Sequence, residues 1–177
     1  MQEEQVVLVN RNDEPVGTME KMKAHEQAVL HRAFSIYIFN SKGEVLLHRR
    51  ALEKYHSGGL WTNTCCSHPR PGEDIADAAN RRLMEEMGME ASLTHLFHFV
   101  YKSPMENGLT EHELDHVFLG ISDDAPNPVP EEVCEWKYVD PEVLIAAIDI
   151  APEQYTSWFK LSLSRVLEHL QTQEFTA

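Results

Sequence analysis

The chain has 177 residues and a formal net charge of −14, from 15 Lys and Arg against 29 Asp and Glu. Its 42% hydrophobic and 25% charged residues exclude disordered and fibrous proteins. No apolar run approaches the roughly 18 residues of a membrane span, the acidic N-terminus lacks a signal-peptide pattern, and the acidic excess argues against nucleic-acid or membrane partners. We therefore expect one domain over residues 1–177, located in the cytoplasm.

The charge is unevenly distributed along the chain. Residues 1–90 hold 11 basic and 14 acidic residues, a net −3, whereas residues 91–177 hold 4 and 15, a net −11. Cations kept in one half of an acidic protein could act locally on a small anion. The alternative is a solvated acidic surface that is merely patchy, and charge alone favours this alternative.

Strands and helices are interleaved in the predicted order of elements. Strands are expected where β-branched and aromatic residues gather, and helices where apolar residues recur at helical spacing. In chain order these are strands at Val6–Val9, Ala33–Phe39 and Val45–His48, a short strand or loop from Gly58 to Trp61, a helix from Asp74 to Met87, strands near Leu93–Tyr101 and Leu114–Ile121, a loop at Pro126, Pro128 and Pro130, and helices at Val143–Ile148 and Tyr155–Leu170. This order predicts a mixed α/β (α+β) sandwich.

The sequence predicts a cap for one helix and an apolar stripe for another. Gly88 stands where the left-handed cap of the helix ending at Met87 is expected. The last helix has a predicted apolar stripe through Trp158, Leu161, Leu163, Val166 and Leu170.

Three cysteines, Cys65, Cys66 and Cys134, cannot all pair within one chain. A bridge between the adjacent Cys65 and Cys66 would be strained. Free thiols in a reducing compartment fit better. We interpret Cys65 as a small packed thiol and Cys134, which has no motif around it, as structural.

Histidines, a thiol and carboxylates form two candidate centres for chemistry. Cys66 lies two residues before His68, which we expect on a loop; Cys66 could be a metal ligand, a nucleophile or base, or an inert packed thiol. In an extended strand Glu111, Glu113 and Asp115 would share one face. With His25, His31 and His68, the glutamates could surround one transition metal, although such alternation is more often the solvated face of a strand.

The predicted helix ending at Met87 places Arg81 one turn before Glu85, and Arg82 one turn before Glu86. The simple interpretation is two surface ion pairs. The functional interpretation places Glu86 on a Mg²⁺ and Arg82 on the phosphate that the ion carries. Lys21, Arg50 and Lys54 could supply further positive charge.

The segment from Ser67 to Met89 resembles the Nudix box. The matching positions are Ser67, Glu73, Arg81, Arg82, Leu83, Glu85, Glu86, Gly88 and Met89. Ser67 replaces the first glycine of the pattern, and Arg82 replaces a glutamate that helps Nudix hydrolases bind the metal used to cleave a diphosphate. A cation at this position suits a protein that holds a diphosphate without cutting it.

These departures, the stretch Thr62–Pro69 and the Glu111/Glu113 pair together resemble the type I isopentenyl-diphosphate delta-isomerases of the Nudix superfamily. The resemblance extends from Leu8 to Trp158. It implies a Nudix-like α/β/α sandwich with a mixed sheet, and an isomerase that forms dimethylallyl diphosphate from isopentenyl diphosphate for isoprene biosynthesis. The alternatives are a Nudix-type diphosphate hydrolase and a metal-stabilised binding module without activity.

The resemblance also assigns roles by position. It implies Cys66 and Glu113 as catalytic groups, with Tyr101 as a partner of Glu113 and the ring of Trp158 facing a carbocation. The remaining implied sites are the ligands of one divalent transition metal, Mn²⁺ or Zn²⁺, at His25, His31, His68, Glu111 and Glu113; a Mg²⁺ held by Glu86, the backbone carbonyl of Cys66 and the diphosphate; and substrate contacts at Lys21, Arg50, Lys54 and Arg82.

The implied reaction protonates an unactivated alkene and so needs a well-aimed acid, a base and a dry site. Glu113 is a candidate for delivering one proton and a Cys66 thiolate for accepting the other, but the sequence does not fix which acts as acid. No dinucleotide motif suggests an organic cofactor. We expect a small-molecule substrate, neither nucleic acid nor membrane as a partner, and a monomer or weak homo-oligomer.

Overall fold

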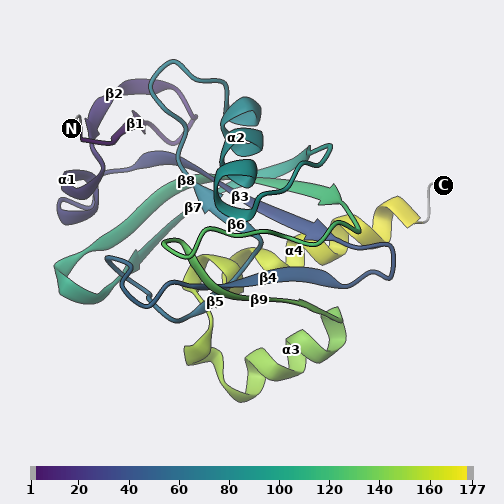
Figure 1. Cartoon of the computed structure of the whole chain (residues 1–177). Coiled ribbons are helices and arrows are strands. Elements are labelled where there is room, and N and C mark those ends of the chain that lie inside the picture. The colour runs from purple at the N-terminus through teal and green to yellow at the C-terminus, as the bar shows by residue number, and fades with distance from the viewer. Residues whose placement is uncertain (1–2, 175–177) are drawn as a thin grey trace.

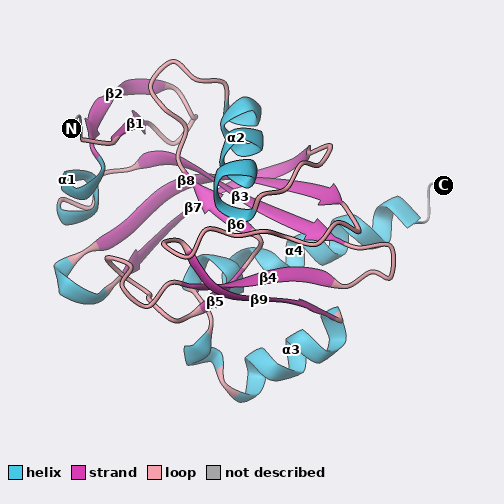
Figure 2. Cartoon of the chain, viewed as in Figure 1, coloured by secondary structure: helices cyan, strands magenta, loops and turns pink. Residues whose placement is uncertain are grey.

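A mixed β-sheet forms the middle of the molecule, and helices lie on both of its sides (Figures 1 and 2). The computed structural model describes residues 3–174. Its elements are β1 Gln5–Val9, β2 Pro15–Glu20, α1 Lys21–Glu26, β3 His31–Phe39, β4 Val45–Arg50, β5 Trp61–Thr62, β6 Cys65–Ser67, α2 Ile75–Met87, β7 Thr94–Pro104, η1 Glu106–Gly108, β8 Thr110–Ile121, β9 Val133–Val139, α3 Pro141–Ile150, η2 Pro152–Gln154 and α4 Ser157–Glu174.

Strand β3 pairs with four other strands of the sheet. It pairs antiparallel with β1, β4 and β6, and parallel with β8 from His31 opposite Glu113 to Phe39 opposite Ile121. Strand β7 adds to β8, and β9 adds to β4. The combination of parallel and antiparallel pairs confirms the predicted mixed sheet.

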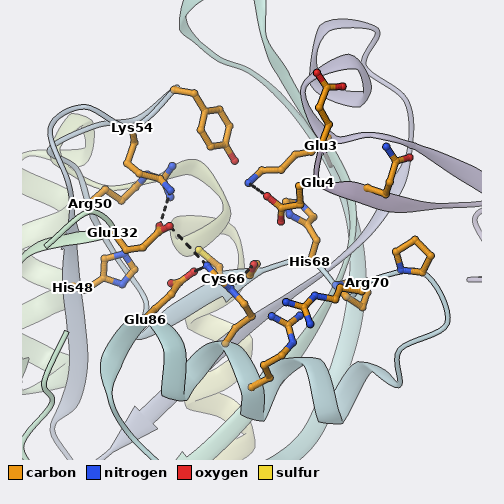
Figure 3. Close-up of a pocket in the computed structure, with 18 residues that line it drawn as sticks. Glu3, Glu4, His48, Arg50, Lys54, Cys66, His68, Arg70, Glu86 and Glu132 are labelled. Carbon is orange, nitrogen blue, oxygen red and sulfur yellow. Dashed lines mark hydrogen bonds and ion pairs between the residues drawn. The ribbon is translucent and has the colours of Figure 1, made fainter. Parts of the chain in front are cut away.

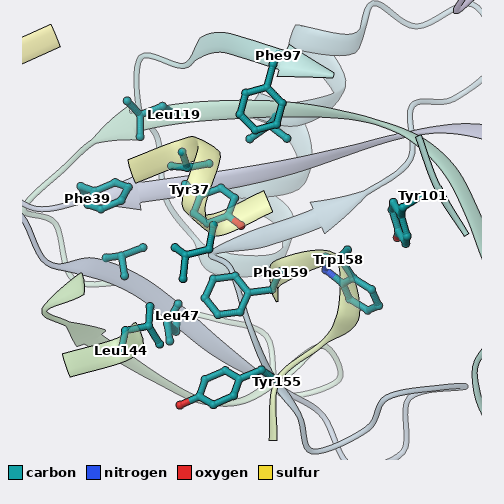
Figure 4. Packing of buried hydrophobic residues seen from close by; sticks show 14 residues of the cluster. Tyr37, Phe39, Leu47, Phe97, Tyr101, Leu119, Leu144, Tyr155, Trp158 and Phe159 are labelled. Atoms are coloured by element: carbon teal, nitrogen blue, oxygen red, sulfur yellow. The ribbon is translucent and has the colours of Figure 1, made fainter. Parts of the chain in front are cut away.

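The two faces of β3 bury two separate apolar cores. Tyr37 and Phe39 pack with side chains of α3 and α4, among them Phe159 (Figure 4). Phe34 and Ile36, which alternate with them, pack against α2 on the other face. Helices cover both faces of the sheet, which confirms the α/β/α sandwich.

The helix predicted from Asp74 to Met87 is confirmed as α2. Asp74 is its N-cap, and its side chain accepts hydrogen bonds from the backbone N–H groups of Ala76 and Asp77. The helix ends at Met87, and Gly88 follows in the left-handed conformation with φ of 62°.

The apolar stripe predicted for the last helix is wrong at one position. Leu161 is 54% exposed, whereas Phe159, which the stripe omitted, is fully buried. The buried face of α4 follows Trp158, Phe159, Ser162 and Val166, at spacings of three and four residues, and Leu161 falls outside it.

The predictions for Cys65 and Cys134 have different outcomes. Cys65 is fully buried among residues that pack against α2, as predicted. Cys134 is exposed on β9, and its structural role stays a prediction. Its side chain lies outside the core, close to the backbone carbonyls of Arg49 and Arg50.

Replacing Gly88 by alanine is expected to lower the free energy of unfolding by about 2 kcal/mol or more. Besides the unfavourable positive φ, a Cβ at this position would stand 2.6 Å from the carbonyl oxygen of Asn127. Urea unfolding of the variant measures the loss. Gly43→Ala is a matched control, since Gly43 has φ of 79° but nothing within 4 Å of the added Cβ. Equal losses of unfolding free energy in Gly88→Ala and Gly43→Ala would contradict a contribution from the contact with Asn127.

Among the described residues, no helix is both long and apolar enough to cross a membrane.

Candidate active site

A cavity of about 510 Å³ opens between the N-terminal segment, the end of β4 and the α2 side of β6 (Figure 3). Six basic side chains line it against four acidic ones, a net charge of +2 in a chain of −14. The charge points to an anionic ligand. The basic residues are Lys21, Arg50, Lys54, Arg70, Arg81 and Arg82, and the acidic ones Glu3, Glu4, Glu86 and Glu132.

A smaller chamber of about 30 Å³ adjoins this cavity. Arg50, Cys66 and His68 line both spaces. The chamber continues to Tyr101, Glu111, Glu113 and Trp158. An anion in the outer cavity would therefore extend its other end towards a thiol, a phenol, two carboxylates and an indole.

A buried cluster of imidazoles and a carboxylate lies beside the chamber. His25, His31, His68 and Glu113 each offer a ligand atom, and these atoms lie within 4.8 Å of one another. Strand pairing explains part of the cluster, since His31 on β3 stands directly opposite Glu113 on β8. Helix α1 supplies His25, and the segment after β6 supplies His68.

Glu111, which we predicted as a ligand of the same metal, lies in an adjoining group. Its Oε1 lies 3.2 Å from Nε2 of His25 and 2.5 Å from Nε2 of His56. His25 thus joins the two groups. His56 was not predicted, because it lies in the irregular segment between β4 and β5, and no spacing relates it to Glu111, 55 residues away.

The donors of the cluster suit a divalent transition metal. Three buried atoms, Nε2 of His31 and Nδ1 of His68 in the cluster and Oε2 of the adjoining Glu111, have no hydrogen-bond partner among the described residues. Buried polar atoms are rarely left without a partner, and imidazole with carboxylate is a ligand set for zinc, iron or manganese. The residues present therefore fit a bound ion.

Glu113 is held by neighbours on both of its oxygens. Tyr101 donates a hydrogen bond from its hydroxyl to Oε2 at 2.6 Å, and Nε2 of His68 lies 2.8 Å from Oε1. Burial raises the pKa of this carboxyl, but the nearby imidazoles of His31 and His68 outweigh burial and hold the pKa well below its usual value. Glu113 is therefore a carboxylate at neutral pH.

The pKa of Cys66 is shifted in the opposite direction. Burial raises the pKa of its thiol, and the nearby Arg50 opposes that shift without cancelling it. The thiol therefore carries its proton at neutral pH. Cys66 lies on the short strand β6, opposite Ser35 of β3, and this pairing fixes its place at the chamber.

Glu86 and Arg82 form an ion pair on the side of α2 that faces the cavity. Burial raises the pKa of the Glu86 carboxyl, and the Arg82 guanidinium partly offsets the rise. Arg82 also donates a hydrogen bond to the hydroxyl of Ser67, the other position that departs from the Nudix box. The interpretation as surface ion pairs is wrong for Arg82 and Glu86, since Glu86 is only 4% exposed.

Glu132, which was not predicted from the sequence, lies close to the cationic side chains of Lys54 and Arg82. Its carboxylate lies 2.6 Å from Nζ of Lys54 and 3.8 Å from the Arg82 guanidinium. It comes from the turn before β9, and no motif surrounds it.

Trp158 closes the chamber from α4. Its side chain is buried in the core cluster of that helix, and the guanidinium of Arg50 stands over its ring, 5.4 Å from the centroid. Trp158 therefore belongs to the core and also lines the chamber.

Comparison with known proteins agrees with the fold. The NUDIX domain model matches residues 29–159. Isopentenyl-diphosphate Delta-isomerase of Pectobacterium atrosepticum is 50% identical over 167 residues, which cover 94% of this chain and 93% of that protein. Isopentenyl-diphosphate Delta-isomerase 2 of Aromatoleum aromaticum is 51% identical over 165 residues, which cover 93% and 87%.

Solved structures share the fold at lower identity. A crystal structure of a Deinococcus radiodurans protein superposes with a TM-score of 0.74 at 24% identity, covering 94% of this chain and 98% of that one. The MutT protein of Methanosarcina mazei gives a TM-score of 0.66 at 19% identity, covering 79% and 94%. At these identities the likeness concerns the fold alone.

Proposed function

The chain belongs to the Nudix family and, within it, to the type I isopentenyl-diphosphate Delta-isomerases, and we propose that Cys66 and Glu113 are the two groups that transfer protons in its reaction. The enzyme converts isopentenyl diphosphate to dimethylallyl diphosphate. The observation that supports our assignment is the small chamber, which both side chains line and which opens into the cationic cavity.

The isomerisation adds one proton at C4 of the substrate and removes one from C2, so no atom is gained or lost overall. Cys66 holds a proton, whereas Glu113 is ionised. The pair can therefore deliver one proton and take up another. Tyr101, bonded to Glu113, extends the path along which a proton can move.

Protonation leaves a tertiary carbocation, which must be kept from water and stabilised. We propose that the face of Trp158 does this, since an aromatic ring attracts a desolvated cation by about 1–2 kcal/mol. The buried walls of the chamber exclude water from the reacting carbons.

Binding of the diphosphate is assigned to Lys21, Arg50, Lys54 and Arg82, all of which line the outer cavity. Contacts to this end of the substrate position the reacting carbons in the chamber. Arg82 also distinguishes the site from that of a Nudix hydrolase, because it stands where hydrolases have a metal-binding glutamate.

Two metal sites belong to this proposal. His25, His31, His68, Glu111 and Glu113 would hold a transition metal, Mn²⁺ or Zn²⁺, and Glu86 with the carbonyl of Cys66 would hold Mg²⁺ on the diphosphate. When bound, these ions supply Lewis acidity beside Glu113 and neutralise the charge of the diphosphate.

The same proposal includes the setting in which the enzyme works. We infer one domain over residues 1–177, acting in the cytoplasm as a monomer or weak homo-oligomer, without nucleic acid or membrane as a partner. The charge of −14 supports the last point. Analytical ultracentrifugation tests the oligomeric state.

The decisive experiment is to incubate the protein with isopentenyl diphosphate, Mg²⁺ and Mn²⁺ or Zn²⁺ in D₂O and to follow the products by NMR. Dimethylallyl diphosphate that carries deuterium, without release of phosphate, is the expected result. Release of phosphate or pyrophosphate would instead support the hydrolase. An unchanged substrate with every metal would contradict the proposed activity.

Lys54→Ala is expected to raise KM for isopentenyl diphosphate about tenfold and to change kcat less, because one charge-assisted contact to the diphosphate is lost. Steady-state kinetics measures both constants. Lys42→Ala is the matched control, since Lys42 is exposed on the turn between β3 and β4, away from the cavity. Unchanged KM in Lys54→Ala would remove Lys54 from the substrate site.

A further inference from the structure

A second group of imidazoles lies on the sheet outside the active site. His95 and His98 of β7 and His116 of β8 each offer a ring nitrogen, and these nitrogens lie within 4.8 Å of one another. Nε2 of His95 is 2.9 Å from Nδ1 of His116, and the rings of His98 and His116 have centroids 5.3 Å apart.

A β-bulge makes this grouping possible. His95 and His98 are three residues apart, so in a regular strand their side chains would point to opposite faces. The register of β7 against β8 shifts between His95 and Phe97, which leaves His95 opposite Phe118 and His98 opposite His116. Bulges redirect side chains in this way, and all three imidazoles consequently lie on one face.

Asp13 orients the buried member of the group. Its Oδ2 lies 2.8 Å from Nε2 of His116, which as the donor carries the proton and leaves Nδ1 with a lone pair turned towards His95. Arg32 holds Asp13 in turn, through hydrogen bonds of 2.7 Å to Oδ1 and to the backbone carbonyl. A carboxylate behind a histidine, fixing its tautomer, is the usual outer support of a metal ligand.

The group is separate from the catalytic cluster. Successive residues of β8 alternate between faces, so Glu113 and Asp115 point to the α4 side and His116 to the other. The side chain of Asp115 accordingly bonds Ser35, while His116 reaches Asp13 in the turn between β1 and β2. His116 is buried, but His95 and His98 are exposed, so an ion could enter from solvent and keep water as a further ligand.

We propose that His95, His98 and His116 form a second metal site that binds a divalent late transition ion, such as Zn²⁺, with three imidazole nitrogens. Imidazole donors suit zinc, copper and nickel, whereas Mg²⁺ prefers oxygen. The site needs no substrate and takes no part in the isomerisation.

Zn²⁺ titration of the metal-loaded enzyme tests the proposal by calorimetry and by the metal content after desalting. The wild-type enzyme is expected to bind about one Zn²⁺ per chain more than His98→Gln, because the three-imidazole set is incomplete in the variant. His95→Gln should lose the same ion. Isomerase activity should be unchanged in both variants, and this separates the second site from the proposed catalytic residues.

Two further variants sharpen the result. Asp13→Asn removes the carboxylate behind His116 and is expected to weaken the additional Zn²⁺ about 10–100-fold; asparagine tolerates the positive φ of 62° at this position. His169→Gln is the matched control, an imidazole on α4 outside the group. Equal Zn²⁺ content in wild type and His98→Gln, or equal loss in His169→Gln, would overturn the proposal.

Discussion

Cys66→Ala is expected to lower kcat about 10³-fold or more while leaving the fold intact, because the variant lacks one of the two proton-transferring groups. Alanine fits the space of the thiol, and the pairing of β6 with β3 depends on the backbone rather than on the side chain. The assay is conversion of isopentenyl diphosphate under saturating substrate and metal, and the melting temperature reports the fold.

The other two thiols provide matched controls for this variant. Cys134→Ala changes an exposed thiol and should retain wild-type turnover. Cys65→Ala changes the neighbouring thiol, which points to the α2 core and lies 3.4 Å from Glu86, so turnover should fall far less than in Cys66→Ala. Wild-type-like turnover in Cys66→Ala would refute its catalytic role.

Glu113→Gln is expected to lose both turnover, about 10³-fold or more, and transition-metal content. The amide keeps the shape of the side chain but carries no charge, so it binds a cation weakly and cannot accept the proton. It also leaves His31 and His68 beside a neutral group instead of a carboxylate. Elemental analysis of the purified variant, together with its kinetics, measures both effects.

The two readouts separate the two roles of Glu113. Full metal content with lost turnover would restrict Glu113 to proton transfer. Retained turnover would contradict the assignment altogether. Glu135→Gln, an exposed carboxylate on β9 that pairs with Arg49, is the control and should change neither quantity.

Much of the fold could be predicted because local signals and tertiary packing agree. Helix α2 has a capping aspartate, an apolar face and a glycine at its end, and its bounds were predicted to within one residue. Strand β9, in contrast, was missed because most of its side chains are exposed and do not alternate clearly. Its position depends on the ladder with β4, a contact that no local pattern contains.

The candidate site could be predicted where residues belong to a motif and was missed elsewhere. His25, His31, His68 and Glu113 lie together as predicted, brought there by β3, β8 and two flanking segments. His56 and Glu132 come from irregular segments whose path depends on contacts far along the chain. Their participation becomes visible only when the chain is folded.

Strand β8 carries important side chains on both of its faces, and this restricts where residues can be inserted into the chain or deleted from it. One residue inserted or deleted near the start of β8 (Thr110–Ile121) would turn both Glu113 and His116 to the face opposite the present one and would move apolar side chains out of both cores at once. The short η1 segment, Glu106–Gly108, joins β7 to β8 and is exposed, so extra residues there would leave the ladder in register. We therefore expect functional variants of this chain to tolerate insertions and deletions in η1 but not in β8.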